Sequence, residues 1–241
     1  TGTTGLDVQV LNSGTVSAQT GTLRLGGGGT HTGTLTATNS AVLQLGNGTH
    51  NLNAGAATGT GTVQLTSGTV NVTAPYTMTN FNMTSGTLTG SGTLTVTGTH
   101  MLTAGSMTGS GQTLLQGNGT ISSLNLDDDR VVQIAGTTAW TGTTSQRIWF
   151  NAVTSTGNGG SLAVTATGVF DIQADALMDY WQGTAGQFSN AGTIRKTVGT
   201  GTTGLDVQVL NSGTVSVQTG TLRLGGGGTH TGSFGTTGSG V

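Results

Sequence analysis

One 33-residue segment occurs twice in this chain and constrains its fold more than any other feature. It is first seen at residues 1–33 as TGTTGLDVQVLNSGTVSAQTGTLRLGGGGTHTG and returns at residues 200–232 with one change, Ala18 to Val217. The offset is 199 residues throughout. Near-identical copies at a fixed spacing are typical of stacked units rather than of a closed globule. The sequence therefore predicts that residues 200–232 repeat the conformation of residues 1–33 one period further along an axis, and that each end adjoins more of the same repeat.

A shorter period lies inside the long one. Triplets of apolar, polar and apolar residues recur at nearly even spacing, and in a strand the two apolar members of a triplet share one face. We expect inward stacks built from Leu23, Leu25, Leu43, Leu45, Val63, Leu65, Phe81, Met83, Leu94 and Val96. Leu94 follows Phe81 by much less than the usual spacing, so one short or distorted coil is expected near Pro75.

A second column follows the first by a few residues in each period. Its members usually come after Gly-Thr or Thr and are His31, His50, Val70, Leu88, His100 and Ile121. Because Val70 and Leu88 are apolar, we expect this column to point inward as well. Leu52, Val72 and Leu102 lie two positions further along and should share its face.

Together the two columns predict an all-β fold, a single-stranded, right-handed parallel β-helix or β-solenoid with coils of about 18–21 residues and little or no α-helix. A single coil cannot bury its own apolar face, whereas stacked coils supply both a core and backbone partners. The right hand follows from the crossover rule for parallel strands. At a strand spacing of about 4.8 Å, some twelve coils would span about 58 Å, and the long period would be about ten coils or 48 Å.

The composition of the sequence and the regularity of its repeat change at Asp127. We expect one continuous solenoid segment over residues 1–241, with regular coils at 1–126, looser coils carrying acidic and aromatic loops at 127–187, and regular coils at 188–241. The middle region contains all three tryptophans. Its residues 175–181 are expected to form a short helical turn or a protruding loop. Exposed loops on a rigid scaffold commonly carry recognition, so any binding function is expected at 127–187.

Composition excludes several classes of protein. Gly and Thr make up about two-fifths of the chain, only 6% is charged, and there is no Glu and no Cys. Low charge and a single proline are unlike disordered chains. A net charge of −2 provides no basic surface for nucleic acid. No apolar run approaches the roughly 20 residues that span a bilayer. The absence of cysteine fits a protein exported unfolded across a bacterial outer membrane.

The run at residues 188–234, FSNAGTIRKTVGTGTTGLDVQVLNSGTVSVQTGTLRLGGGGTHTGSF, resembles the repeats of large bacterial surface and exported proteins of the filamentous-haemagglutinin and autotransporter-passenger type. The resemblance implies a right-handed β-helix that serves as an adhesin, stalk or matrix component, located outside the cell or on its surface. Its partners would be further copies of the repeat, and surface glycans or other cells. The resemblance brings no catalytic or cofactor-binding residues, and we expect no enzyme activity.

Histidines and acids are the candidate ligands for metals. His31 and His50 should lie about 5 Å apart on adjacent coils, but a metal site needs three or four ligands, and Val70 and Leu88 continue their column. We therefore expect structural histidines. Clustered aspartates could bind Ca²⁺, yet no calcium-binding motif is present, so a solvated charged loop paired with Arg130 is expected instead. These acids are Asp127, Asp128, Asp129, Asp171, Asp175 and Asp179.

Two further motifs suggest other functions. The GGGG runs at 26–29 and 225–228 lack the Lys and Ser/Thr of a P-loop, so we interpret them as corners. Alternating threonines at 30–38 and 93–99 resemble those of ice-binding solenoids, each set being expected on one face. The sequence thus predicts a structural segment of a fibre, stalk or adhesin, with ice binding as the first alternative and carbohydrate binding or carbohydrate chemistry, using the acids above, as the second.

Overall fold

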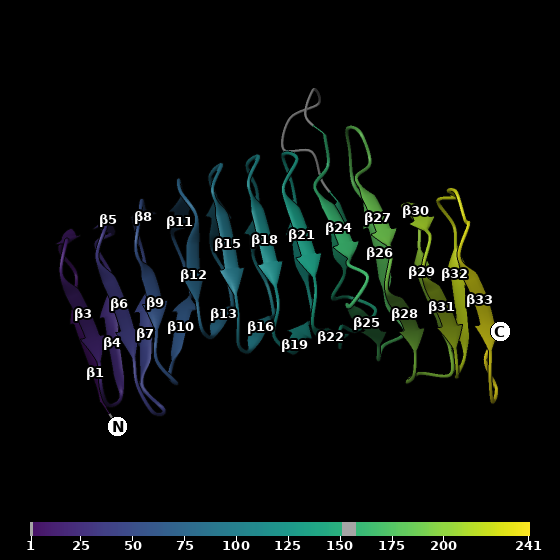
Figure 1. The fold of residues 1–241 in the computed structure, drawn as a ribbon, viewed down its shortest axis with the longest axis horizontal. Coiled ribbons are helices and arrows are strands. Elements are labelled where there is room, and N and C mark those ends of the chain that lie inside the picture. Colours follow the sequence, from purple (N-terminus) through teal and green to yellow (C-terminus); the bar gives the residue numbers. More distant parts are fainter. Residues whose placement is uncertain (1, 151–157) are drawn as a thin grey trace.

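The protein is a rod of stacked coils, seen in a computed structural model that describes residues 2–150 and 158–241. Three parallel sheets run along the rod, which we name sheets A, B and C, and each coil contributes one strand to each in turn. The coils follow one another in chain order, with the two termini at opposite ends (Figure 1). The described residues contain no helix. The predicted all-β parallel solenoid is thereby confirmed.

The strand bounds follow the sheets. Sheet A contains β1 (Thr3–Leu6), β4 (Thr22–Leu25), β7 (Val42–Leu45), β10 (Thr62–Leu65), β13 (Phe81–Met83), β16 (His100–Leu102), β19 (Gly119–Ile121), β22 (Thr137–Trp140), β25 (Val169–Ile172), β28 (Thr193–Lys196), β31 (Thr214–Val217) and β33 (Ser233–Thr236). Sheet B contains β2 (Val10–Asn12), β5 (Gly29–His31), β8 (Thr49–Leu52), β11 (Thr69–Val72), β14 (Thr87–Thr89), β17 (Ser106–Met107), β20 (Leu124–Leu126), β23 (Ile148–Phe150), β26 (Leu177–Tyr180), β29 (Thr202–Leu205) and β32 (Thr221–Leu224). Sheet C contains β3 (Thr15–Ala18), β6 (Thr34–Ala37), β9 (Ala56–Thr58), β12 (Tyr76–Met78), β15 (Thr93–Val96), β18 (Gln112–Leu115), β21 (Val131–Ile134), β24 (Ser161–Val164), β27 (Gln187–Asn190) and β30 (Gln208–Asn211).

Coil length varies along the rod. In the regular part the coils are short and nearly equal, so that Val63 pairs with Phe81 and Thr22 pairs with Val42. In the middle region the step is much longer, and Thr137 pairs with Val169. Some of the extra residues lie at 141–147, between β22 and β23, and residues 151–157 fall outside the described residues. The region predicted to be looser is therefore a set of wider coils.

The inward stacks form, with one correction to their assignment. All ten residues expected inside are buried except Leu23, which is half-buried. However, Leu94 and Val96 belong to sheet C, where β15 pairs with β12, while Phe81 pairs with His100 in sheet A. The short step from Phe81 to Leu94 is the passage of the chain from sheet A to sheet C. The expected short coil near Pro75 was wrong.

The second column also points inward, but it is not one column. Val70 pairs with both His50 and Leu88 in sheet B, and all three side chains are fully buried. His31 pairs with Leu52, two positions out of step, and His100 lies in sheet A. Ile121 is in sheet A too, paired with Leu102. The inward orientation was predicted correctly, and the alignment of the three histidines was not.

Glycine is abundant because the corners stack on one another. Between sheets A and B, four consecutive regular coils turn at a glycine with positive φ, at Gly48, Gly68, Gly86 and Gly105. A Cβ added to Gly86 would lie 2.9 Å from the Gly68 carbonyl oxygen of the coil below. Only glycine adopts this backbone conformation at little cost and leaves room for the neighbouring corner. The GGGG run at 26–29 is also a corner, as predicted, and a side chain on Gly29 would collide with the carbonyl of Val10.

A second kind of corner explains the recurrent Asn-Ser-Gly and Asn-Ala-Gly words. The Asn12 carboxamide oxygen accepts the backbone N–H of Gly14, and Asn190 accepts that of Gly192 in the same way. Both asparagine side chains are buried. This corner joins sheets B and C at Asn12 but sheets C and A at Asn190. Its geometry is therefore local and works at more than one corner of the rod.

The two copies of the long repeat lie on different sheets. Residues 3–6 form β1 in sheet A, whereas their equivalents at 202–205 form β29 in sheet B. β29 is the twenty-eighth strand after β1 among the described residues, which at three strands per coil is nine and a third coils. The copies use equivalent strands through residue 224, as predicted. The period, however, spans about 45 Å rather than the roughly 48 Å of ten full coils, and the second copy is turned by one sheet.

Larger side chains fill the wider coils. Trp140, Phe150, Phe170 and Phe188 are all fully buried, and the Trp140 and Phe170 rings stack with centroids 6.0 Å apart. Bulky aromatic rings supply the volume that a wider cross-section requires. Residues 177–180 form strand β26 rather than the expected helical turn or loop, because Met178 takes an inward position paired with Ile148.

Candidate functional site

The histidines are packed inside the rod. Nε2 of His31 and Nδ1 of His50 share a hydrogen bond of 3.3 Å, and the two rings stack. Burial lowers the pKa of His50 to about 4, with a further contribution from His31, and burial lowers the pKa of His31 too. His100 bonds Thr138 at 3.0 Å, and burial lowers its pKa to about 4. These rings are neutral at pH 7, as structural histidines would be.

The candidate acids are dispersed rather than gathered at one site. Asp171 pairs with Arg195 at 2.9 Å in sheet A, and Asp179 pairs with Arg147 at 3.8 Å in sheet B. Among the described residues, no three potential metal ligands come together. The acids at 127–129 lie between β20 and β21, where Asp128 accepts a hydrogen bond from Thr108. Burial raises the pKa of Asp127 to about 6, helped by the neighbouring Asp128.

Arg130 does not pair with these acids, contrary to expectation. Its side chain is fully buried, and its guanidinium donates to Thr113 Oγ1 and to the carbonyls of Gln112 and Gly90, at 2.9 to 3.2 Å. Burial lowers its pKa to about 10. Neutral oxygens thus hold this cation inside the rod at the junction between the regular and wider coils.

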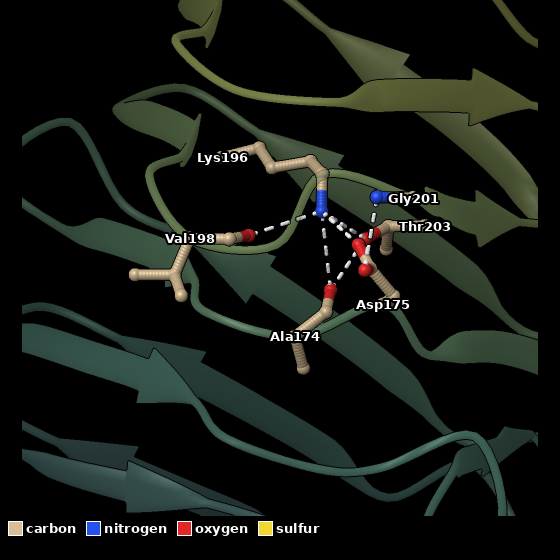
Figure 2. Close-up of polar contacts among 6 residues, drawn as sticks. All are labelled: Ala174, Asp175, Lys196, Val198, Gly201 and Thr203. Atoms are coloured by element: carbon tan, nitrogen blue, oxygen red, sulfur yellow. Dashed lines mark hydrogen bonds and ion pairs between the residues drawn. The ribbon is translucent and has the colours of Figure 1, made fainter.

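Lys196 is a second buried cation, and Figure 2 shows its surroundings. Its ammonium lies 2.7 Å from Asp175 Oδ1, 3.0 Å from Thr203 Oγ1 and 3.1 Å from the Val198 carbonyl. Asp175 also accepts the backbone N–H of Gly201 at 3.0 Å. The hydrogen bond from Lys196 lowers the pKa of the Asp175 carboxyl. The ammonium therefore joins the connection after β25 to the connection after β28.

Lys196 was not identified from the sequence as an interior residue. Its register partners are Ile172 in the preceding coil and Val217 in the following one, so it stands in an apolar column. The alternation of the word TIRK would have placed it inward, but a lone lysine at the end of a strand is ordinarily assigned to the surface. The ammonium of Lys196 donates its hydrogen bonds to groups of the rod itself, which makes it a structural residue.

Three aromatic residues in or directly after β23 and β26 of sheet B are at least partly exposed. We call Arg147, Trp149, Asp179, Tyr180 and Trp181 the aromatic surface. Trp149 and Trp181 meet edge to face with centroids 6.1 Å apart, and the Arg147 guanidinium lies 5.0 Å from the centre of the Trp149 ring. Trp181 is 73% exposed and Tyr180 is 45% exposed. The region predicted to carry recognition thus presents some of its aromatic side chains to solvent, while others fill the core.

An open groove of about 540 Å³ adjoins the aromatic surface. The row Leu177, Gly204 and Arg223 crosses sheet B here, and Arg147 also lines the groove. Gly204 has no side chain to occupy the floor of the groove, and a Cβ at this position would lie 3.0 Å from Arg223 Nη2. Asp175, which bonds Lys196, contributes a carboxylate to the same groove. Aromatic faces beside arginine and aspartate are a combination suited to a polar ligand with an apolar face.

The threonine sets do not form the faces expected of them. Thr30 lies in sheet B, whereas Thr34 and Thr36 lie in sheet C, so the first set is divided between two sides of the rod. In sheet B the row beside Thr30 continues as Asn51 and Asn71, whose side chains bond one another at 2.9 Å. The expectation that each set occupies one face was wrong.

Comparison with models of protein families, with curated protein sequences and with solved structures finds no match to this chain. In the described part of the chain, no helix has the length and hydropathy that crossing a membrane as a helix requires. A function is therefore inferred from the sequence of the chain and from the geometry of the rod and its surfaces.

Proposed function

We propose that this chain is a structural segment of an extracellular bacterial fibre, stalk or adhesin, in which the 199-residue unit is stacked end to end. The observation that carries the proposal is a difference in burial between identical residues of the two copies of the repeat. Leu6 is 39% exposed and Val8 is 69% exposed in the first coil, whereas their equivalents Leu205 and Val207 are 0% and 1% exposed. The apolar residues of the first coil thus have the composition of an interior coil.

The preceding coil accounts for this burial. In the second copy, β29 pairs with β26, and Gly204 and Leu205 stand opposite Leu177 and Met178. The edge of β1 presents the same sequence without a neighbour. Unpaired strand edges with apolar side chains favour the addition of further strands. A preceding unit would supply that neighbour, and tandem copying of one unit supplies it in every repeat.

The resemblance of residues 188–234 to bacterial surface proteins supports the extracellular location. So does the absence of cysteine, because chains without disulfides can be exported unfolded and fold outside. The partners of the segment are further copies of the unit, and its role is mechanical, with no chemical turnover.

The proposal is tested with a lengthened chain in which residues 1–199 are followed by residues 1–241. The junction reproduces the natural passage from Gly199 to Thr200, since Thr1 and Thr200 are equivalent. Small-angle X-ray scattering should show a single rod whose longest dimension exceeds that of the present chain by about 45 Å. Two rods joined at an angle, or a collapsed particle, would contradict it.

Carbohydrate binding is a second candidate function, favoured by the aromatic surface. Exposed indole rings stack on the apolar faces of sugars, and Arg147 and Asp179 could hold hydroxyl groups beside them. A glycan array probed with the purified protein tests this role. Binding that is lost in Trp181→Ala and kept in Met101→Ala, an exposed residue on sheet A, would support it; no binding above background to any glycan would contradict it.

A further inference from the structure

The long repeat does not contain a whole number of coils. In the first copy, β1, β2, β3 and β4 lie in sheets A, B, C and A, and their equivalents β29, β30, β31 and β32 lie in sheets B, C, A and B. The described residues of the unit form 28 strands, and 28 is not a multiple of three. Each passage along the unit therefore ends one sheet away from where it began.

The local structure of the repeat is kept when it changes sheet. On sheet A, Arg24 extends across Gly5 and donates to Asp7 at 2.9 Å. On sheet B, Arg223 extends across Gly204 and donates to Asp206 at 2.6 Å. The Asn-Ser-Gly word likewise ends one strand and precedes the next in both copies, between β2 and β3 and between β30 and β31. Sequence therefore specifies each strand and each corner, but it does not specify which side of the rod they occupy.

We propose that successive units of the fibre are turned about the rod axis by one sheet, about a third of a turn, as each advances by about 45 Å. This inference rests on the end-to-end array proposed above. A strand on sheet B in one unit lies on sheet C in the next and on sheet A in the one after. Three units, which together contain 28 full coils, return every residue to its original side after about 134 Å.

The turn has a consequence for the aromatic surface. Here Trp149 and Trp181 lie on the outer side of sheet B. In a fibre of such units, the same surface points in three directions in succession, so one rod presents it on every side. Sites repeated along a rigid rod can bind a multivalent partner with an avidity far above the affinity of one site. A fibre in which every unit faced the same way would instead present the surface along one side only.

The turn also identifies the neighbour of the first coil. Because β29 packs on β26, the strand that covers β1 in the fibre is the β26 of the preceding unit, although β1 is in sheet A here and β26 is in sheet B. The sheets of one unit are thus continued by different sheets of the next. Leu6 and Val8 become buried by this contact, as Leu205 and Val207 are now.

A crystal structure of the lengthened chain, with residues 1–199 followed by residues 1–241, tests the inference. We expect one continuous solenoid in which the two copies of Trp149 lie on different sheets, related by a third of a turn. A matched control lacks residues 43–62 in its second unit, which removes one full coil because Val63 then takes the place of its register partner Leu43. A third unit is added to this control, so that the units on either side of the shortened one can be compared. The rotation between them across the shortened unit should remain a third of a turn, and the axial distance that the shortened unit spans should fall by about 5 Å.

The possible results separate the two proposals. A continuous rod with both aromatic surfaces on the same side would overturn the turn between units and leave the array intact. A chain whose second unit does not stack on the first would overturn the array and, with it, this inference. A rod whose shortened unit changed its angle would show that unit length, rather than the number of strands modulo three, determines the turn, and would also overturn the inference.

Discussion

The regular coils before residue 127 and the wider coils that follow are filled with different side chains. Leucine and valine stack in the regular coils, where Leu45, Leu65 and Met83 succeed one another in register. The wider coils contain large aromatic rings and have a buried cation at each end, Arg130 and Lys196. A regular coil therefore depends mainly on apolar contacts, together with a few buried neutral histidines, whereas the wider coils depend also on oxygen atoms that surround a buried cation. The predictions below test this difference.

The largest effect is expected from a charge in the regular stack. Leu65→Asp would place an unpaired carboxylate between Leu45 and Met83, in a fully buried position. We expect a loss of about 5 kcal/mol or more in the free energy of unfolding, because no group there can satisfy the charge. Urea denaturation followed by circular dichroism measures it. Gln64→Asp, on the outer side of the same strand, is the control and should change stability by about 1 kcal/mol or less.

In the wider coils, removing the buried ammonium should cost nearly as much. Lys196→Ala leaves Asp175 and Thr203 without their partner and creates a cavity, so we expect a loss of about 3–5 kcal/mol. The double variant Lys196→Met with Asp175→Asn fills the space without a charge and should recover more than half of the loss. If the double variant lost as much stability as Lys196→Ala, filling the space without a charge would not replace the ion pair, and this explanation of the loss would be wrong.

Acid should destabilise the rod through the histidines of the regular coils. The folded pKa values of His50 and His100, about 4, lie below the unfolded value near 6.5, so the unfolded chain takes up protons first as the pH falls. Stability is complete above about pH 6.5 and declines toward about pH 4. Asp127 acts in the opposite sense between about pH 6 and 4, because its folded pKa is raised. The net loss from pH 7.5 to 4.5 should be about 3 kcal/mol.

Urea denaturation at both pH values checks this expectation. His50→Val, which places at this position the residue found at its register partner Val70, should remove about 2.5 kcal/mol of this loss and leave only a small net pH dependence. An unchanged slope in this variant would assign the acid sensitivity to other groups.

The smallest effect is expected at the outward ion pairs of the repeat. Asp7→Asn and Asp206→Asn each remove an arginine partner at the surface, and such pairs contribute about 0.2–1 kcal/mol. Addition of about 1 M NaCl to the unmodified protein should reduce this contribution further. A loss well beyond that range in either variant would mean that the pair also supports the strand beneath it.

Much of the fold could be predicted from the sequence because strands and corners are each specified by residues that are close together in the chain. Alternation within words such as Leu43-Gln44-Leu45 indicates strands, and recurrent Gly-Thr and Asn-Ser-Gly indicate corners. Assignment of strands to sheets does not follow, since the same words are used on all three sides. For that reason Leu94 was placed in the wrong stack, and the 28-strand count of the unit was not recognised.

The candidate sites were only partly predictable. The region that presents aromatic side chains was located, but whether each tryptophan of a strand faced inward or outward depends on strand register, which buries Trp140 and turns Trp149 outward. Arg130 and Lys196 were not expected inside, because a buried cation is recognised only when the oxygens around it are known. Those oxygens come from residues far from the cation in sequence, as Gly90 is from Arg130, and coil stacking brings them together.

The parallel pairing of each coil with the next has a mechanical consequence. Along the described strands, each strand bonds only to the coil before it and the coil after it, so a pull on the two ends of the chain peels the rod from its ends. A regular coil of about 20 residues then releases roughly 65–70 Å of chain. The longer coil that leads from Thr137 to Val169 should release about 110 Å and interrupt the even series. Under tension, a fibre of such units would lengthen in small, nearly equal steps, with one long step and one moderately longer step marking each repeat.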